Sequence, residues 1–77
     1  MPKLPVLSGE ELIKILLKQG FEKVRQKGSH ISLRKITPDR EYRTVVPSHP
    51  ELARGTLVSI LKQCGITKEE LIRIVEK

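Results

Sequence analysis

The stretch FEKVRQKGSHISLRKITPDREYRTVVP, residues 21–47, sets the architecture of this chain. Short runs of apolar and polar residues with a period of two predict three β-strands here. The expected strands are residues 21–26, 30–36 and 42–46. A glycine-containing loop joins the first two strands, and a turn with proline and aspartate joins the second to the third. Because such short connections link neighbouring antiparallel strands, we expect a three-stranded antiparallel meander.

A helix is predicted before the meander. Ser8 and Glu11 have the spacing of a capping box, in which each side chain accepts a hydrogen bond from the backbone amide of the other residue. Apolar residues then recur on one face, and Gly20 supplies a left-handed stop. The first helix is therefore expected from about Gly9 to Gln19.

Two further helices are predicted after the meander. Thr56 is expected to cap a helix that Gly65 ends, and Thr67 with Glu70 forms a second capping box that opens a short last helix. Three strands with helices before and after are best packed with the helices on one sheet face. We therefore predict an α+β fold of order α-β-β-β-α with an extra short C-terminal helix, whose second sheet face is open.

At 77 residues the chain has room for one domain, residues 1–77, with residues 1–7 as a flexible or extended arm. So small a core leaves no cavity for a small-molecule cofactor, and we expect none. Cys64 is the only cysteine, which excludes an internal disulfide and suits a reducing cytoplasm. The sequence has no apolar run long enough to span a membrane, so we expect a cytoplasmic protein without a membrane partner.

Positive charge is concentrated in the strands. Between residues 23 and 43 the chain carries seven basic residues against two acidic ones, Asp39 and Glu41. The basic residues are Lys23, Arg25, Lys27, Arg34, Lys35, Arg40 and Arg43. Such a local excess is typical of a surface that binds a polyanion, most simply a nucleic acid, and an acidic protein partner would also fit.

Strand alternation assigns side chains to the two sheet faces. In the second strand, Ile31 and Leu33 are expected to point toward the helices. The open face then receives His30, Ser32 and Arg34. In the first strand, Val24 is expected to face the helices, which would place Lys23 and Arg25 on the open face near His30.

His30 is the candidate catalytic residue. An imidazole with an ordinary pKa of about 6.5 can accept or donate a proton near neutral pH. RNA carries its own nucleophile, the 2′-hydroxyl, so one such group with cations at the phosphate can suffice without a metal. His49 precedes Pro50 and is interpreted as a turn residue. With no cysteine or carboxylate cluster nearby, the two histidines predict no metal site.

Several motifs together resemble those of one known family. They are Leu7-Ser8-Gly9, Gly20-Phe21, Arg25-Gln26-Lys27-Gly28-Ser29-His30, Val45-Val46-Pro47, Gly55-Thr56-Leu57, and Ile60-Leu61-Lys62-Gln63 with Gly65. In this order they resemble the HicA (YcfA-like) mRNA interferase toxins, and the resemblance covers nearly the whole chain. Ile31 stands where a second histidine often follows the first in that family, so catalysis is assigned to His30 alone.

The resemblance implies a double-stranded-RNA-binding-domain-like fold and a metal-independent endoribonuclease that acts on mRNA without the ribosome. It also implies a type II toxin-antitoxin pair, in which a HicB-type antitoxin covers the site. Gly28 and Ser29 would position His30 and the scissile phosphate. Strand alternation adds Lys27, Arg25 and Arg34 as substrate-binding residues.

Two other functions remain open at this stage. A non-catalytic RNA-binding module of the same fold would use the same basic face for phosphate contacts. Residues 56–75 also have the outline of a DNA-binding helix-turn-helix. Glu69 and Glu70 argue against the second, because they would start the recognition helix close to the phosphates.

Overall fold

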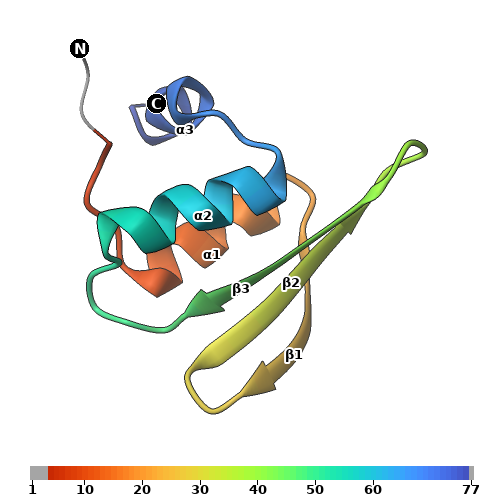
Figure 1. Ribbon diagram of the computed structural model, residues 1–77, viewed down its shortest axis with the longest axis horizontal. Helices are drawn as coiled ribbons and strands as arrows, with labels where there is room; N and C mark the ends of the chain where they lie inside the picture. The colour runs from red at the N-terminus through yellow and green to blue at the C-terminus, as the bar shows by residue number, and fades with distance from the viewer. Residues whose placement is uncertain (1–3, 77) are drawn as a thin grey trace.

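The computed structural model of the chain describes residues 4–76. The elements are α1 (Gly9–Lys18), β1 (Glu22–Lys27), β2 (His30–Ile36), β3 (Glu41–Pro47), α2 (Arg54–Cys64) and α3 (Lys68–Val75). The strands form one antiparallel sheet in the order β1-β2-β3. Helices α1 and α2 lie against one face of this sheet, and α3 lies on the side of these two helices that faces away from the strands (Figure 1). The predicted α+β fold, with its order α-β-β-β-α and an additional C-terminal helix, is confirmed.

The helix ends form as their local sequences predict. Ser8 and Glu11 make both bonds of the capping box, at 3.1 and 2.9 Å. Thr67 and Glu70 do the same at the start of α3. Gly65 ends α2 with a left-handed φ of 70°, which a side chain rarely adopts. These short-range signals therefore place the start of α1, the end of α2 and the start of α3 as predicted.

The core lies between the sheet and the helices. Ile31 and Leu33 on β2 are buried, as alternation predicts, and Val46 on β3 joins them. The hydroxyl of buried Thr44 donates to Gln63 Oε1 on α2 at 2.7 Å, so this polar group keeps a partner inside the core. The helices contribute leucine, isoleucine and cysteine side chains to the buried cluster, including Leu12, Leu16, Leu57, Ile60, Leu61, Cys64 and Leu71.

The expected orientation of β1 is wrong at Val24, because the strand carries a β-bulge. The register pairs Lys23 with Leu33 and Arg25 with Ser32, so one extra residue stands between them. Val24 is 50% exposed and does not enter the core. The bulge resets the alternation, which keeps Arg25 on the open face and turns Lys23 to the opposite one.

The expected start of α2 is also wrong. The helix begins at Arg54, its N-cap residue Ala53 has no side-chain cap, and Thr56 lies inside the first turn. The backbone amide of Leu52 donates to the carbonyl of Leu7 at 2.8 Å, which fixes the chain just before the helix. The first hydrogen bond of the helix runs from the amide of Leu57 to the carbonyl of Ala53. This tertiary contact fixes the chain before α2, and no side chain caps the first turn of the helix.

The expected N-terminal arm covers residues 1–7, of which residues 1–3 lie outside the described part of the chain. Leu4 packs against the core, and Leu7 is buried. Two residues later, Gly9 packs against the backbone at the end of β3 and just after it. Its backbone amide donates to the carbonyl of His49 at 2.9 Å, and a Cβ at this position would stand 2.0 Å from the carbonyl oxygen of Pro47.

We predict that Gly9→Ala lowers the free energy of unfolding by about 1–3 kcal/mol, the usual cost of forcing extra volume into a packed site. The obstacle is backbone, so a side-chain rotation cannot relieve it. Gly55→Ala is the matched control, because its Cβ would meet nothing within 4 Å in a helix, and it should be neutral or slightly stabilising. Urea unfolding measures both. Equal stability of the two variants would contradict the close packing at Gly9.

Candidate functional site

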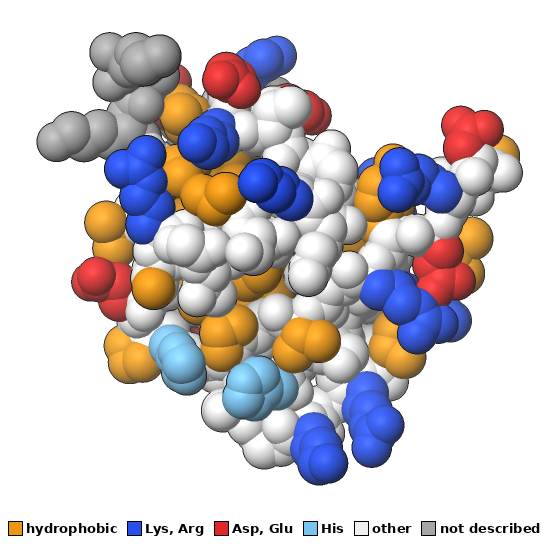
Figure 2. Space-filling view, in the orientation of Figure 1, with side chains coloured by type: hydrophobic (Ala, Val, Ile, Leu, Met, Phe, Trp, Pro, Cys, Tyr) orange, Lys and Arg blue, Asp and Glu red, His pale blue; other side chains and the backbone are white. Residues whose placement is uncertain are grey.

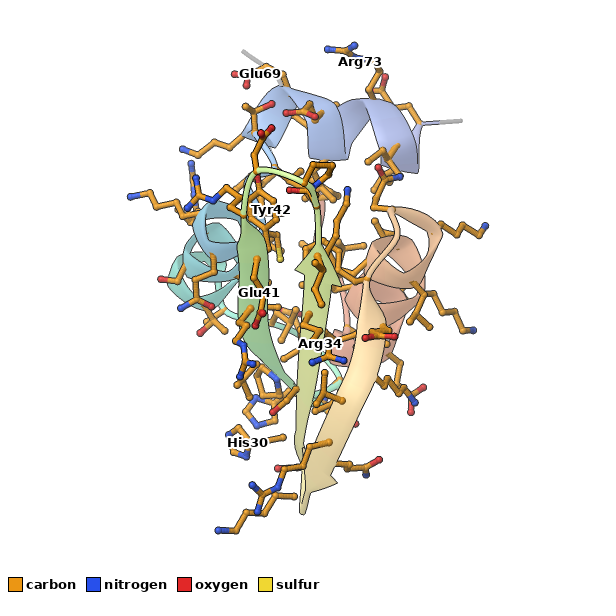
Figure 3. The ribbon with its side chains drawn as sticks, turned by 90° about the vertical axis from the view of Figure 1, so that its right-hand side faces the viewer. His30, Arg34, Glu41, Tyr42, Glu69 and Arg73 are labelled. Carbon is orange, nitrogen blue, oxygen red and sulfur yellow. The ribbon has the colours of Figure 1, made fainter. Side chains whose placement is uncertain are left out.

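The candidate catalytic histidine stands at one end of the sheet. His30 is the first residue of β2 and is exposed. Its neighbours in register are Lys27 on β1 and Pro47 on β3. Figure 3 shows the His30 side chain at the end of the sheet remote from α3, free of the protein core. An imidazole in this position is accessible to a large substrate.

The turn before His30 is as tight as two strands allow. Lys27 ends β1 and His30 begins β2, so Gly28 and Ser29 form a two-residue turn. Gly28 has a φ of 59° and no other residue in the turn has a positive φ, the pattern of a type II′ hairpin turn. A Cβ on Gly28 would meet nothing within 4 Å, so the glycine serves the backbone conformation and leaves open space above the turn.

Most of the cations in the basic segment already have partners. Arg34 and Arg43 form ion pairs with Glu22 and Glu41, respectively. Two others make cation–π contacts. Lys35 Nζ lies 5.9 Å from the centroid of the Phe21 ring, and Arg40 Cζ lies 4.9 Å from that of Tyr42. Within residues 4–76, the three that take part in neither kind of contact are Lys23, Arg25 and Lys27. Of these, Arg25 and Lys27 share the open face with His30.

Arg34 is therefore not equivalent to the other predicted substrate-binding residues. Its Nε donates to Glu22 Oε1 at 2.7 Å across the β1–β2 ladder. The hydrogen bond and the charge of Glu22 raise the pKa of Arg34. Glu22 lies one residue outside the segment in which the charges were counted, so the sequence count overstates the free positive charge. The antiparallel register places Glu22 opposite Arg34, so a correct strand alignment would have predicted this ion pair.

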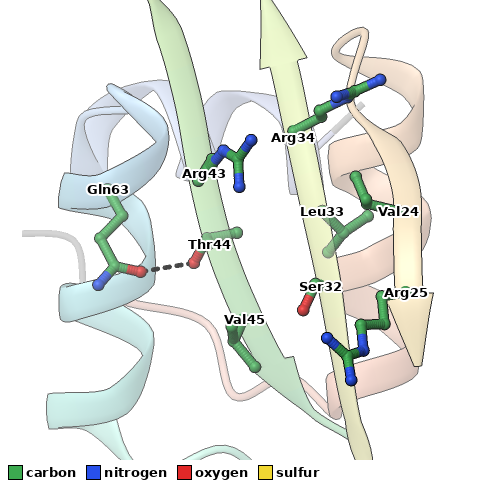
Figure 4. Close-up of a pocket in the computed structure, with 9 residues that line it drawn as sticks. All are labelled: Val24, Arg25, Ser32, Leu33, Arg34, Arg43, Thr44, Val45 and Gln63. Atoms are coloured by element: carbon green, nitrogen blue, oxygen red, sulfur yellow. Dashed lines mark hydrogen bonds between the residues drawn. The ribbon is translucent and has the colours of Figure 1, made fainter. Parts of the chain in front are cut away.

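A hollow of about 500 Å³ lies on the open sheet face, over the middle of the three strands (Figure 4). Arg25, Arg34 and Arg43 line it, together with the exposed apolar side chains of Val24 and Val45. Figure 4 shows Arg25 reaching from β1 toward Ser32 on β2, its partner in register. His30 does not line this hollow. The predicted site residues thus fall into two neighbouring groups, with Arg25 near both.

Other candidate chemistry is weaker. The Cys64 thiol is buried in the core, and burial raises its pKa to about 11, so it is a poor nucleophile at neutral pH. Among residues 4–76, no group of three or more histidine, cysteine, aspartate and glutamate side chains is arranged to hold a metal ion. No helix in the same range has the length and apolar character needed to cross a bilayer.

Residues 9–66 match the family model described as the HicA toxin of bacterial toxin-antitoxin systems. The chain belongs to the HicA toxin family. No curated protein and no solved structure matches it. The matched region runs from the start of α1 through the end of α2, so it includes the Gly28-Ser29-His30 turn and the whole sheet.

Membership makes this HicA-family chain one half of a toxin-antitoxin pair. It also agrees with the resemblance seen in the sequence motifs. The geometry adds the position of His30 at one end of the sheet, and it distinguishes the cations that are paired from those that are not. Space-filling Figure 2 shows lysine and arginine side chains beside the histidines at one end of the molecule.

We predict that Glu22→Gln strengthens binding of a short single-stranded RNA, because it releases Arg34 from its ion pair. One additional phosphate contact should steepen the slope of log K against log salt by about 0.7. Glu69→Gln on α3 makes the same change in net charge far from His30 (Figure 3) and should leave the slope unchanged. Fluorescence anisotropy over a salt series measures both variants. Identical slopes in the two would show that Glu22 acts only through net charge.

Proposed function

We propose that this HicA-family toxin is an mRNA interferase of a type II toxin-antitoxin system, an endoribonuclease that cleaves RNA with His30 and without a metal ion. The observation that carries the proposal is the exposed His30 at a Gly-Ser-His turn, with Lys27 directly opposite it and Arg25 on the same face. The single cysteine in a buried position suits action in the cytoplasm.

The reaction uses the nucleophile of the RNA itself. His30 takes part in moving the proton of the 2′-hydroxyl, or in supplying one to the departing 5′-oxygen. The 2′-oxygen attacks phosphorus, the bond to the 5′-oxygen breaks, and the products carry a 2′,3′-cyclic phosphate and a 5′-hydroxyl. Lys27 and Arg25 stabilise the charge that grows on the phosphate oxygens.

Gly28 and Ser29 position the histidine and the scissile phosphate. The left-handed Gly28 leaves open space above the turn, which permits the phosphate to approach the backbone. The carbonyl of Ser29 accepts from the amide of Ser48 at 2.6 Å, so the turn is held to the segment after β3. This bond supports a fixed direction for the His30 backbone.

A HicB-type antitoxin is the partner we propose for the same face. The open face presents exposed apolar residues, Val24 and Val45, among arginines. A partner with acidic and apolar side chains fits such a mixture, because it would bury the valines and pair the cations together. RNA and antitoxin would then compete for one surface.

A non-catalytic RNA-binding module is the second candidate. The observation in its favour is the arginine-lined hollow, to which His30 makes no contribution. Phosphate contacts across such a face require no histidine. Substitution of His30 separates the two functions, since a binder keeps its affinity and a nuclease loses its turnover.

We predict that His30→Ala slows cleavage of a long single-stranded RNA in excess chelator by about 10²- to 10⁴-fold, the usual contribution of one acid-base group. Affinity for RNA should remain within a few-fold, and the melting temperature should hardly change, because His30 is exposed. Identical purification of both proteins controls for contaminating nucleases. Equal cleavage by the two, or none by either, would favour the RNA-binding module.

A further inference from the structure

The second histidine of the chain lies at the same end of the sheet as the first. Pro47 is the partner of His30 in register, and His49 follows it by two residues. The hydrogen bond from the amide of Ser48 to the carbonyl of Ser29, at 2.6 Å, continues this contact beyond the last ladder pair. Figure 2 shows the histidine side chains, in pale blue, next to one another on one face. Two separate segments thus bring two imidazoles together.

The backbone that carries His49 is fixed. Its carbonyl accepts from the amide of Gly9 at 2.9 Å, one residue after Ser48 is bonded to the turn. Leu52 is bonded to Leu7 at 2.8 Å, so the loop is attached to the start of α1 at both of its ends. Gly9 permits this approach because any Cβ would collide with the carbonyl of Pro47. The backbone of this loop is therefore held by hydrogen bonds at Ser48, His49 and Leu52.

Both imidazoles are free. His30 and His49 are exposed, and within residues 4–76 neither side chain takes part in a hydrogen bond or an ion pair. The backbone of His49 contributes to the fold, but its unengaged imidazole does not. The interpretation of His49 as a turn residue accounts for its place in the loop but not for a second exposed imidazole beside the first.

We propose that His49 is a second catalytic residue, which shares with His30 the two proton transfers of RNA cleavage. This inference rests on the proposed ribonuclease function. One neutral imidazole takes the proton of the 2′-hydroxyl while the 2′-oxygen bonds to phosphorus. The other, protonated, imidazole gives its proton to the 5′-oxygen as the phosphorus–oxygen bond breaks. Atoms and charge balance, and no water is consumed.

Several charged groups lie in the segments around the two histidines. By chain position or register, those nearest to the two histidines are Lys27 and Arg25 on β1, Glu51 in the loop, Arg54 at the start of α2, and Glu10 and Glu11 in the first turn of α1. Glu11 is engaged in its capping box with Ser8, so it is not free to approach the site. Lys27 and Arg25 are the cations available to the phosphate between the imidazoles.

The first test compares His49→Gln with Glu51→Gln, a matched substitution at an exposed position of the same loop. In chelator and under single-turnover conditions, we expect His49→Gln to slow cleavage by about 10²- to 10⁴-fold. Glu51→Gln should stay within a few-fold of the parent. The pH–rate profile should be bell-shaped in the parent and lose one limb in His49→Gln. A merely structural role for His49 would lower the rate without removing a limb.

The second test uses an RNA in which sulfur replaces the bridging 5′-oxygen at one cleavable linkage. A thiolate leaves without a proton, so this substrate restores cleavage to the variant that lacks the general acid. We expect it to rescue one of the two variants, His30→Gln or His49→Gln, and not the other. The rescued variant identifies the acid, and either assignment supports the proposal.

The outcomes separate this inference from the function on which it rests. Full activity and an unchanged pH profile in His49→Gln, with His30→Gln inactive, would overturn the role of His49 and leave the histidine nuclease standing. Absence of cleavage by the parent protein would overturn the nuclease itself. Melting temperatures of all variants should agree, because both positions are exposed; a large drop for His49→Gln would assign it to the fold.

Discussion

The close packing of Gly9 against the backbone that follows β3 is the contact on which the rest of the site depends. It joins the start of α1, the end of the sheet and the loop to α2 at one point, through the bond from the Gly9 amide to the His49 carbonyl. Because a Cβ would overlap the Pro47 carbonyl, only glycine allows the helix to come so near. The same contact carries the chain toward Leu52 and so determines where α2 begins.

The features that the sequence predicted well depend on residues only a few positions apart. Capping boxes, the left-handed glycines that end helices and a glycine-containing turn between β1 and β2 are local features, and each formed where it was expected. The two wrong expectations depend on distant partners. Val24 lies outside the core because a bulge changes the register against β2. Thr56 lies inside α2 because the helix begins at Arg54, just after Leu52 is bonded to Leu7. No short-range rule contains that information.

The candidate site also combines features that the local sequence predicts with features that depend on distant residues. His30 and the turn before it could be proposed from a tripeptide, from alternation and from a family resemblance. The pairing of Arg34 with Glu22 and the proximity of His49 to His30 arise from antiparallel register and from a loop contact. A count of basic residues along the chain therefore finds the basic segment but overstates its free charge. Arg25 and Lys27 remain the unpaired cations of the open face among the described residues.

An exposed site limits what electrostatics can contribute to the proposed reaction. In water, two unit charges 4 Å apart interact by only about 1 kcal/mol, so Lys27 and Arg25 cannot replace a buried oxyanion site. Proton transfer and positioning must then supply most of the rate, which favours two placed imidazoles over one. The same exposure makes the site easy to block, because a partner that covers the open face needs no conformational change in the toxin. A shallow surface on 77 residues is therefore compatible both with slow cleavage and with complete inhibition by an antitoxin.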